Sequence, residues 1–589
     1  MDRKGIIAVT LSVITLFAWT FYNQREMDKA AAYQRSIAQE AQRVKAEEEA
    51  RNPPAPVPAA EVPAVPSIPA APVVEEKTQN FNTAAVDYTF SNLGGGISRA
   101  LLRSHEAERG QKMVMNEFGA IPIGAITEVA GEGARTPFNL QIDPATGVIS
   151  FERIDARQLK TEKKFTLPNA GAQLEDYVVQ LDVSFTNQSS APIALPGYFV
   201  HTGSAAPVHQ DDLVTYTGVK AAGGKFIDAS WFASGGFLFW SHPDRPVYTE
   251  SRPNSAWLGV ANQYFTTIVT PRVTSQDSAE QAKQRGNAVW ARRLTIPDAN
   301  WKASGRSSAN VTEHYGVDGA LGMPGFSLEA GKTFSQSFTI YSGPREYQRL
   351  AKLGADQEDI LDFGMFGIVS RTLLNGMNWL NARFGSYAAA IIVLTLIIKS
   401  LLWPLQNKAT QSMKRMQLLQ PKMLELREKY ADDPARMNTE TMKLYRDYGA
   451  NPLSGCLPML IQIPIFFGFY NMLGKAVELR NSKFLWVPDL SQPDTIFHLA
   501  GVPVNILPLV MAGTMFWQMA ISPKTGDPMQ QRIFMFMPLI FIFFCYNFAS
   551  ALALYWTVQN LFSVVQLYAT RNQAPPQLTK KVTAPAKRK

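Results

Sequence analysis

The chain has 589 residues, which is too long for one ordinary hydrophobic core, and its formal net charge is +8. Its two cysteines, Cys456 and Cys545, both lie in the apolar C-terminal half, so residues 80–345 have no disulfide framework and no CxxC metal site exists. The basic residues cluster beside apolar runs, which indicates a membrane face rather than a nucleic-acid-binding domain.

The N-terminus carries Arg3 and Lys4 before an apolar stretch from Gly5 to Tyr22. This pattern is typical of either a cleaved signal peptide or a retained anchor. Because the stretch ends in aromatic residues, we favour an anchor over residues 1–23 with its N-terminus in the cytoplasm. Residues 24–79 then form a charged and Pro/Ala-rich linker, which the prolines keep extended.

Residues 80–345 show the alternation of β-strands. "FNLQI", "YVVQLDVSFTN" and "TFSQSFTIYSG" each place apolar residues at every second position, and Gly and Pro separate the strands at short intervals. The pattern predicts an antiparallel β-sandwich domain.

Residues 346–385 return to helical spacing, with Leu373, Met377 and Leu380 on one face. We expect an amphipathic helix in the membrane interface; a helix packed on the sandwich is the alternative.

Residues 386–570 contain five further apolar runs long enough to cross a bilayer. They lie at about 386–403, 453–474, 503–520, 532–548 and 551–569. With the anchor this makes six transmembrane helices, an even number, so both termini face the cytoplasm. The loop 404–452 and the tail 571–589 are rich in Lys and Arg, and this topology puts both on the cytoplasmic side.

Lys399 stands inside the first of these five runs, where a charge is costly. No Asp or Glu lies in any of the six spans, but uncharged polar residues do. Gathered around Lys399, they would line a hydrophilic groove. The alternatives are that Lys399 snorkels to the headgroups and that the amides hydrogen-bond between helices. The polar residues, Lys399 included, are Thr395, Lys399, Gln462, Gln518, Tyr555, Gln559, Asn560 and Gln566.

The loop 404–452 predicts a cytoplasmic hairpin of two helices, separated by "ADDP". Methionine adapts to varied apolar partners, so these side chains are candidates for first contact with other proteins. Alternatively they hold the two helices together. The methionines are Met413, Met416, Met423, Met437 and Met442.

Three long motifs resemble the YidC membrane protein insertases of Gram-negative bacteria. They are "NPLSGCLPMLIQIPIFFGFYNML", "DPMQQRIFMFMPLIF" and "QLLQPKMLELREKY…DDPARMNTETMKLYRDYGANP", and "LGVANQYFTTIVTP" resembles the periplasmic domain of that family. The resemblance implies a five-helix insertase core, a periplasmic β-sandwich and an inner-membrane location. It also implies insertion and folding of membrane proteins, alone or with the Sec translocon, without catalysis, metal or cofactor.

The resemblance further implies a groove with one positive residue, usually Arg in the family and Lys399 here. The tandem Tyr pair of many members is Tyr555–Trp556 in this chain. A client protein would leave the groove sideways near Ile465, Phe466 and Met535. Implied partners are nascent membrane proteins, the Sec translocon and its accessory proteins, ribosomes and lipids, with no direct nucleic-acid recognition. The tail 571–589 would bind ribosomes or anionic lipid.

Two other function classes remain as alternatives. A secondary transporter or channel would need an ion site near the midplane and inverted repeats. A membrane-anchored enzyme would need a site in the sandwich, where His201, His209 and His242 are close in sequence but fit no motif.

Overall fold

A computed structural model describes residues 75–571, except 109, 144–147, 169–174, 211, 235–242, 275–280, 282, 307–312, 449–456, 500–501 and 523–537. The predicted anchor, nearly all of the linker, the tail beyond Arg571, Met535 and His242 therefore lie outside the described residues.

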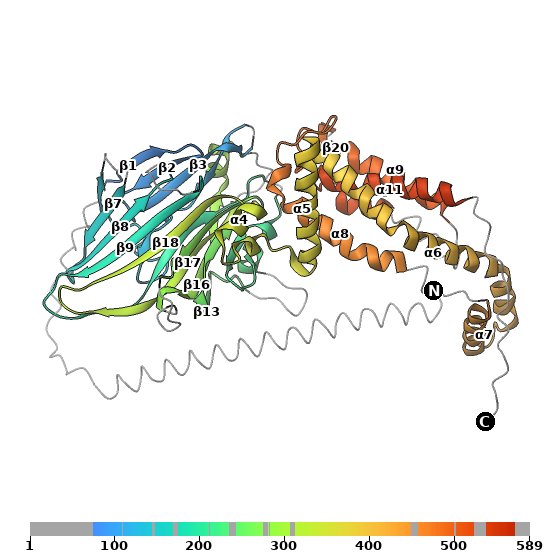
Figure 1. Ribbon diagram of the computed structural model, residues 1–589, viewed down its shortest axis with the longest axis horizontal. Coiled ribbons are helices and arrows are strands. Elements are labelled where there is room, and N and C mark those ends of the chain that lie inside the picture. The colour runs from blue at the N-terminus through green and yellow to red at the C-terminus, as the bar shows by residue number, and fades with distance from the viewer. Residues whose placement is uncertain are drawn as a thin grey trace, which may run out of the picture. The chain divides into compact units, whose positions relative to one another are not determined.

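The N-terminal part of the described chain is built from antiparallel sheets, as the alternation predicted (Figure 1). A four-stranded sheet has the order β1 (Thr78–Asn82), β2 (Val86–Ser91), β3 (Gly96–Glu106), β4 (Lys112–Met115). A five-stranded sheet has the order β13 (Val247–Ser255), β16 (Gly286–Pro297), β17 (Glu313–Leu328), β10 (Ile193–Ala205), β5 (Ile126–Thr127).

The largest sheet has nine strands. Its order is β12 (Ile227–Asp228), β11 (Gly218–Ala221), β14 (Leu258–Ala261), β15 (Phe265–Pro271), β18 (Thr333–Pro344), β9 (Val178–Asn187), β8 (Leu159–Thr166), β7 (Ile149–Ile154), β6 (Asn139–Ile142). The three quoted segments of alternating residues form β6, β9 and β18, so those strand predictions are confirmed.

The smaller sheets pack on one face of the nine-stranded sheet. Phe165 pairs across the strands with Leu181, so the two side chains share a face, and Phe185 follows Leu181 by an even number of residues. Phe90 of the four-stranded sheet lies 5.2 Å from Phe165, and Tyr198 of the five-stranded sheet lies 5.2 Å from Phe185, measured between ring centroids. The domain is therefore a two-layer β-sandwich with an apolar interior.

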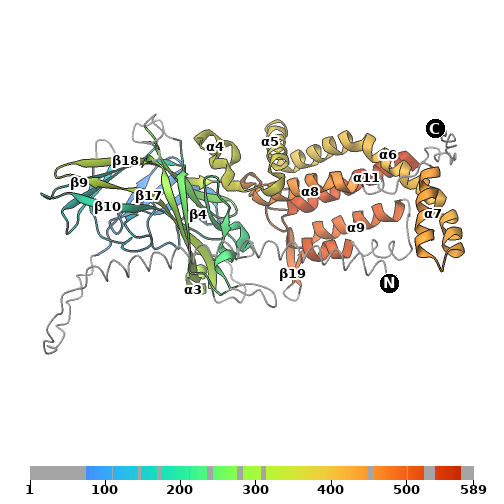
Figure 2. The same cartoon turned by 90° about the horizontal axis from the view of Figure 1, so that it is seen from below.

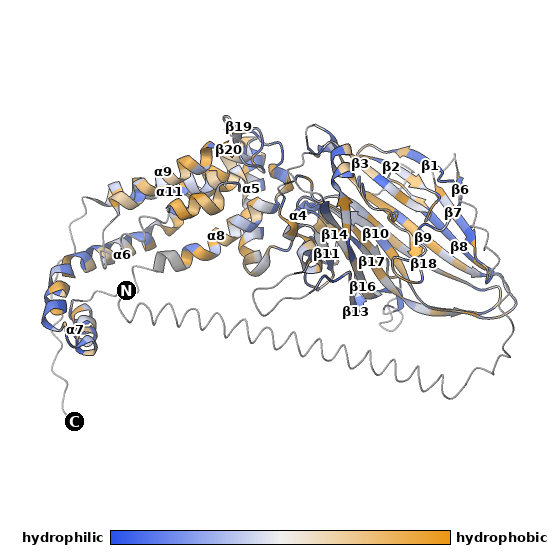
Figure 3. Cartoon of the chain, turned by 180° about the vertical axis from the view of Figure 1, so that it is seen from behind, coloured by the Kyte–Doolittle hydropathy of each residue, from blue (hydrophilic) through white to orange (hydrophobic). Residues whose placement is uncertain are grey.

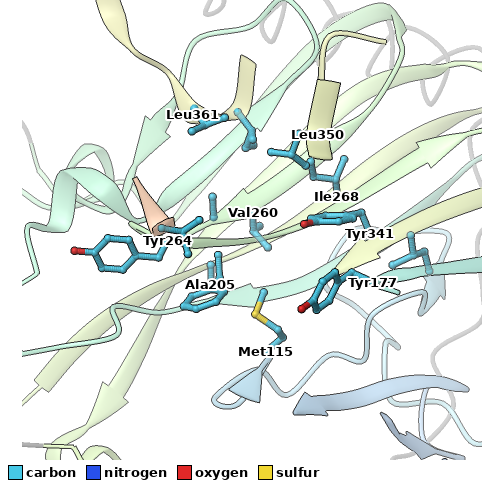
Figure 4. Close-up of a cluster of buried hydrophobic side chains, with 14 of the residues drawn as sticks. Met115, Tyr177, Ala205, Val260, Tyr264, Ile268, Tyr341, Leu350 and Leu361 are labelled. Carbon is cyan, nitrogen blue, oxygen red and sulfur yellow. The ribbon is translucent and has the colours of Figure 1, made fainter. Parts of the chain in front are cut away.

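Close approach of the layers depends on a glycine in β17. A Cβ on Gly319 would lie 2.8 Å from Val260 of β14, closer than real side chains permit. Figure 4 shows part of the same core, where Val260, Ile268 and Tyr341 gather with Met115 and Ala205.

The remainder of the described chain is mainly helical (Figures 1 and 2). The longer helices are α5 (Gly367–Phe384), α6 (Tyr387–Lys429), α7 (Pro434–Asp447), α8 (Leu457–Lys475), α9 (Ile506–Ile521) and α11 (Ser550–Arg571). Two shorter helices, α3 (Asp298–Ala303) and α4 (Tyr347–Leu353), accompany the sheets, and a ribbon of β19 (Thr495–Leu499) and β20 (Val502–Asn505) precedes α9. Figure 3 shows apolar residues dominating α9 and α11, whereas α7 is largely polar.

Helix α6 continues from the apolar run directly into the polar loop. Ser386 caps its N-terminus by accepting a hydrogen bond from Ala389 N–H, and the helix passes through Pro404 and Pro421 without ending. The first helix of the predicted hairpin is thus an extension of the predicted span. Among the described residues, α6 is the one helix that is both long and apolar enough to cross a membrane, and α9 is a shorter apolar helix.

Helix α5 packs against α6 and α8. Its buried face contains Leu373, Met377 and Leu380, as the spacing predicted, and Ser370 Oγ donates to Gly468 O of α8 at 3.1 Å. Ile368 and Trp379 remain exposed on the opposite side. The helix therefore carries apolar residues on two faces, which suits a position between the helical core and lipid.

Candidate functional site

Lys399 lies in α6 and is turned toward α11. Its side chain is half-buried, and Nζ donates a hydrogen bond to Ser563 Oγ at 3.2 Å. Ser563 in turn donates to the backbone oxygen of Gln559, one helical turn earlier. The Lys399 ammonium is thus hydrogen-bonded to the neighbouring helix α11.

A small cavity of mixed polar and apolar lining adjoins Lys399. Its volume is about 20 Å³, which is sufficient for about one water molecule. Gln566 is buried and also lines the cavity; its Nε2 has no hydrogen-bond partner among the described residues. The lining residues are Lys399, Leu402, Leu405, Gln406, Ile461, Gln462 and Gln566.

Gln462 connects the cavity to a second polar group on α11. Its Nε2 donates to Tyr555 Oη at 3.1 Å and to Gln559 Oε1 at 3.0 Å. Tyr555 is buried, and its ring stacks on Phe469 with centroids 4.0 Å apart. Gln462 therefore lines the cavity and also hydrogen-bonds to α11.

Other predicted groove residues are placed elsewhere. Thr395 is buried and donates to Ile391 O of its own helix at 2.7 Å. Asn560 donates to Met511 O and Thr514 Oγ1, so it joins α11 to α9, as in the helix-pairing alternative. Gln518 of α9 is not among the residues that line the cavity. We expected these three beside Lys399; Thr395 instead bonds within its own helix, and Asn560 bonds to α9.

Trp556 belongs to an apolar cluster rather than to the polar one. Its ring lies 4.7 Å from Phe466 and 4.7 Å from Phe541 between centroids. Neighbouring positions on a helix point about 100° apart, so Tyr555 and Trp556 cannot share a face. Ile465 and Phe466 are half-buried on α8.

The sequence also contained a signal for one polar lining residue that we did not select, Gln406. Gln406 follows Lys399 by seven residues, and Gln566 follows Gln559 by the same interval, which places each pair on one helix face. Ser563 lies four residues after Gln559 and was missed because a lone serine in an apolar run carries little signal. Heptad spacing from Lys399 would have found Gln406.

The methionines of the hairpin divide into two groups. Met416 and Met423 pack against buried Leu419 and Tyr445, and Tyr445 Oη contacts Met423 Sδ at 3.0 Å, so these methionines join the two helices. Met442 is exposed on α7. Met413 and Met437 are half-buried.

The histidines of the sandwich have separate environments. His201 Nε2 is hydrogen-bonded to Thr127 Oγ1 at 3.0 Å, while His209 lies 3.1 Å from Arg480 Nη1. No group of three His, Cys, Asp or Glu side chains suited to a metal ion occurs within the described part of the chain.

Two family models match the chain. The model described as "60Kd inner membrane protein" matches residues 379–577, and that described as "YidC periplasmic domain" matches residues 78–375. A protein of Syntrophus aciditrophicus named "Membrane protein insertase YidC" is 33% identical over 428 residues, which cover 72% of this chain and 69% of that protein. The chain belongs to the YidC family of membrane protein insertases.

A YidC relative from Geobacter metallireducens is 28% identical over 591 residues, covering 96% of this chain and 97% of that protein. A solved structure titled "Active YidC insertase crystal structure with the first transmembrane domain resolved" is 17% identical, with a TM-score of 0.34, and covers 85% of this chain and 94% of that chain. The two family-model matches adjoin inside α5. The β-rich periplasmic domain and the helical core predicted from the resemblance are confirmed.

Proposed function

We propose that this protein inserts and folds other membrane proteins in the bacterial inner membrane, alone or beside the Sec translocon, through a hydrophilic groove centred on Lys399. Family membership supports insertion as the activity. The proposal of a groove is supported by the hydrogen bond between Lys399 and Ser563, which lies beside Gln462 and Gln566. No nucleotide, metal or other cofactor enters the proposal.

The first step is electrostatic. An acidic residue in the short N-terminal tail of a client is attracted to the Lys399 ammonium, because opposite charges interact more strongly where water is scarce. Ser563, Gln462 and Gln566 offer hydrogen bonds that replace part of the hydration that the tail loses. The tail then crosses a shortened apolar path.

The second step is hydrophobic. The apolar segment of the client moves sideways into lipid along α8, near Ile465 and Phe466, and along the span that contains Met535. Transfer of each buried CH₂ group from water favours insertion by about 0.8 kcal/mol, so an apolar helix supplies the driving force.

The topology proposed for this function has six spans with both termini in the cytoplasm. The nine Lys and Arg residues of loop 404–452 and the six of tail 571–589 support a cytoplasmic location for both segments. The sandwich then lies in the periplasm, where it is available to Sec accessory proteins.

The hairpin of α6 and α7 is proposed to meet clients first. Exposed Met442 suits this role, whereas Met416 and Met423 support the hairpin itself. The basic tail would bind ribosomes or anionic lipid.

The test is Lys399→Ala, with Lys399→Arg as the conservative variant and Lys408→Ala as the matched control. Lys408 is an exposed lysine on the same helix, outside the cavity. Loss of one charge-assisted hydrogen bond, worth about 1.5 kcal/mol, should slow insertion of a client with an acidic tail roughly tenfold. Insertion into proteoliposomes is measured by protease protection.

Lys399→Arg and Lys408→Ala should retain near-normal rates, and a client with a neutral tail should be less affected by Lys399→Ala. Unchanged insertion of the acidic client by Lys399→Ala would remove the electrostatic step.

A further inference from the structure

The β19–β20 ribbon is a two-stranded antiparallel sheet with no third strand among the described residues. Its outer side chains are unusually apolar for an exposed ribbon. Phe497 is 52% exposed and Leu499 is 66% exposed, and Ile496 is also exposed. Soluble proteins protect such edges with charges, especially lysine, because unpaired edges invite aggregation.

The segment "TIFHLAGVPVN", residues 495–505, contains no Lys, Arg, Asp or Glu. Leu485 and Trp486, in the turn before the ribbon, are also exposed, and the Trp486 indole is hydrogen-bonded to Asp494 at the base of the ribbon. An apolar surface that lacks charge and carries a tryptophan is typical of the aromatic belt at a membrane–water interface.

The base of the ribbon is fixed firmly to the helical core. Asp494 Oδ2 accepts hydrogen bonds from Trp486 Nε1 at 3.0 Å and from Leu507 N–H at 2.7 Å, at the start of α9. Asn505 Nδ2 donates to Tyr546 O at 2.8 Å, and Tyr546 Oη donates to Pro503 O at 2.7 Å. The ribbon is therefore held at a fixed depth relative to α9.

Helix α9 continues the apolar surface. Leu509 and Val510 are exposed in its first turns, directly after the ribbon. Figure 2 shows β19 beside the start of this helix. The exposed side chains of a membrane helix face lipid, so the ribbon extends a surface that already contacts the bilayer.

We infer that the ribbon inserts its apolar side chains into the periplasmic leaflet, at the boundary between headgroups and acyl chains. The inference rests on the proposed topology, which places the start of α9 on the periplasmic side. The unpaired backbone groups at both edges exclude the hydrocarbon interior, where nothing could hydrogen-bond them. In the interfacial zone the apolar side chains can contact acyl chains, and the backbone groups at the strand edges can hydrogen-bond to headgroups and water.

The experiment measures the depth of the ribbon in the intact protein. In a Cys456→Ser/Cys545→Ala background, a nitroxide label is placed by Phe497→Cys or Leu499→Cys, and the full chain is reconstituted in phosphatidylethanolamine–phosphatidylglycerol vesicles. Val129→Cys is the control, because Val129 is a similarly exposed apolar residue of the sandwich. Collision with oxygen, which concentrates in lipid, is compared with collision with a water-soluble nickel chelate.

The oxygen-to-nickel collision ratio at residues 497 and 499 should exceed that at residue 129 at least fivefold. Equal ratios would place the ribbon in water and overturn the inference. Protection from both reagents would also overturn it, because protein would then cover the ribbon; if dilution into excess lipid removed that protection, the cover would be a second copy of the chain.

The same labelled samples are assayed for insertion of the acidic-tail client. Normal insertion combined with a water-like ratio would reject the ribbon inference and leave the proposed function intact. A lipid-like ratio combined with failed insertion by the unlabelled Cys-free protein would support the ribbon inference and reject the proposed function.

Discussion

Glu478 lies in the short turn Val477–Leu479 that follows α8, and its carboxyl accepts a hydrogen bond from Asn378 Nδ2 of α5 at 3.3 Å. Burial disfavours the charged form and raises the pKa of Glu478 to about 7, although the Asn378 hydrogen bond acts in the opposite direction. The contact between α5 and the end of α8 is therefore most stable when Glu478 is protonated.

We predict that Glu478→Gln stabilises the protein at pH 8. The folded state holds the Glu478 proton up to about pH 7, whereas the unfolded chain releases it near pH 4.5, so this group lowers stability as pH rises between those values. Glutamine removes that loss and should raise the free energy of unfolding at pH 8 by on the order of 2–3 kcal/mol. Thermal unfolding of the full chain in detergent at pH 5 and pH 8 measures the effect.

The matched control is Glu329→Gln, at an exposed position between β17 and β18. It should change the unfolding temperature equally at both pH values. If Glu478→Gln behaved in the same way, the Glu478 carboxyl would be ionised in the folded protein at neutral pH.

Individual charged residues were predicted unevenly. Lys399 was conspicuous because one charge interrupts a long apolar run. Lys163 was not, because it lies beside Lys164 in a strand and reads as solvent-exposed. It is fully buried, and Nζ donates to Gly94 O at 2.6 Å and Gly124 O at 3.2 Å. Those acceptors come from loops distant in sequence, so no local pattern could reveal them.

At the scale of elements, α5 and α8 meet at a glycine. A Cβ on Gly468 would lie 2.7 Å from Val369 Cγ1 and 3.2 Å from Leu373 Cδ1. The same close approach permits the hydrogen bond from Ser370 Oγ to Gly468 O. A side chain at this position must separate the two helices.

We predict that Gly468→Ala destabilises the helical core by about 1–3 kcal/mol, because overpacking outweighs the helix preference of alanine. Gly513→Ala in α9 is the control: a Cβ there meets nothing within 4 Å, so the change should be neutral or slightly stabilising. Unfolding in mixed detergent micelles, followed by circular dichroism, compares the two. Equal stability of both variants would show that α5 can move away from α8 without cost.

The elements themselves were largely predictable, and their junctions were not. The amphipathic spacing of α5 and the alternation of β9 follow from burial of one face, which local sequence records. The continuity of α6 does not, because Pro404 and the change from apolar to polar residues both suggested a boundary. The contacts of Asn560 also depend on how α9 and α11 are rotated about their axes, which the periodicity of either helix leaves open.

At the scale of the whole molecule, three histidines of the sandwich lie in surroundings that disfavour their charged form; His201 is buried, and His105 and His209 are half-buried. Burial, reinforced by nearby cations, lowers the pKa of His105 to about 4, of His201 to about 3 and of His209 to about 3. The cations beside His209 are Arg480 and Arg306, and Arg480 comes from the segment after α8. Protonation of any of these rings opposes the folded state.

We predict that the sandwich loses stability as pH falls from about 6.5 toward 4. Between these values the unfolded chain binds protons that the folded chain excludes, so each histidine costs about 1.4 kcal/mol per pH unit. This effect is opposite in sign to that of Glu478. Fluorescence of the full chain on heating at pH 7.5 and pH 5 reports it, since Trp290 lies 5.9 Å from the His201 ring.

His201→Gln should reduce the difference in unfolding temperature between the two pH values. His498→Gln, at an exposed residue of the ribbon, should leave it unchanged. If His201→Gln left the difference in unfolding temperature between the two pH values unchanged, the His201 ring would be able to take up a proton in the folded protein.

Helix α6 contains both Lys399 and the hairpin tip at Lys429, which are separated by about 45 Å along the helix axis at 1.5 Å per residue. Midway between them, Lys414 Nζ donates to Thr570 O at the end of α11 at 2.8 Å. Pro404 and Pro421 each lack the backbone N–H that would bond to the preceding turn, so α6 can bend on either side of this contact. Because Lys399 and the hairpin belong to one helix, the attachment of Lys414 to α11 stands between them along the chain.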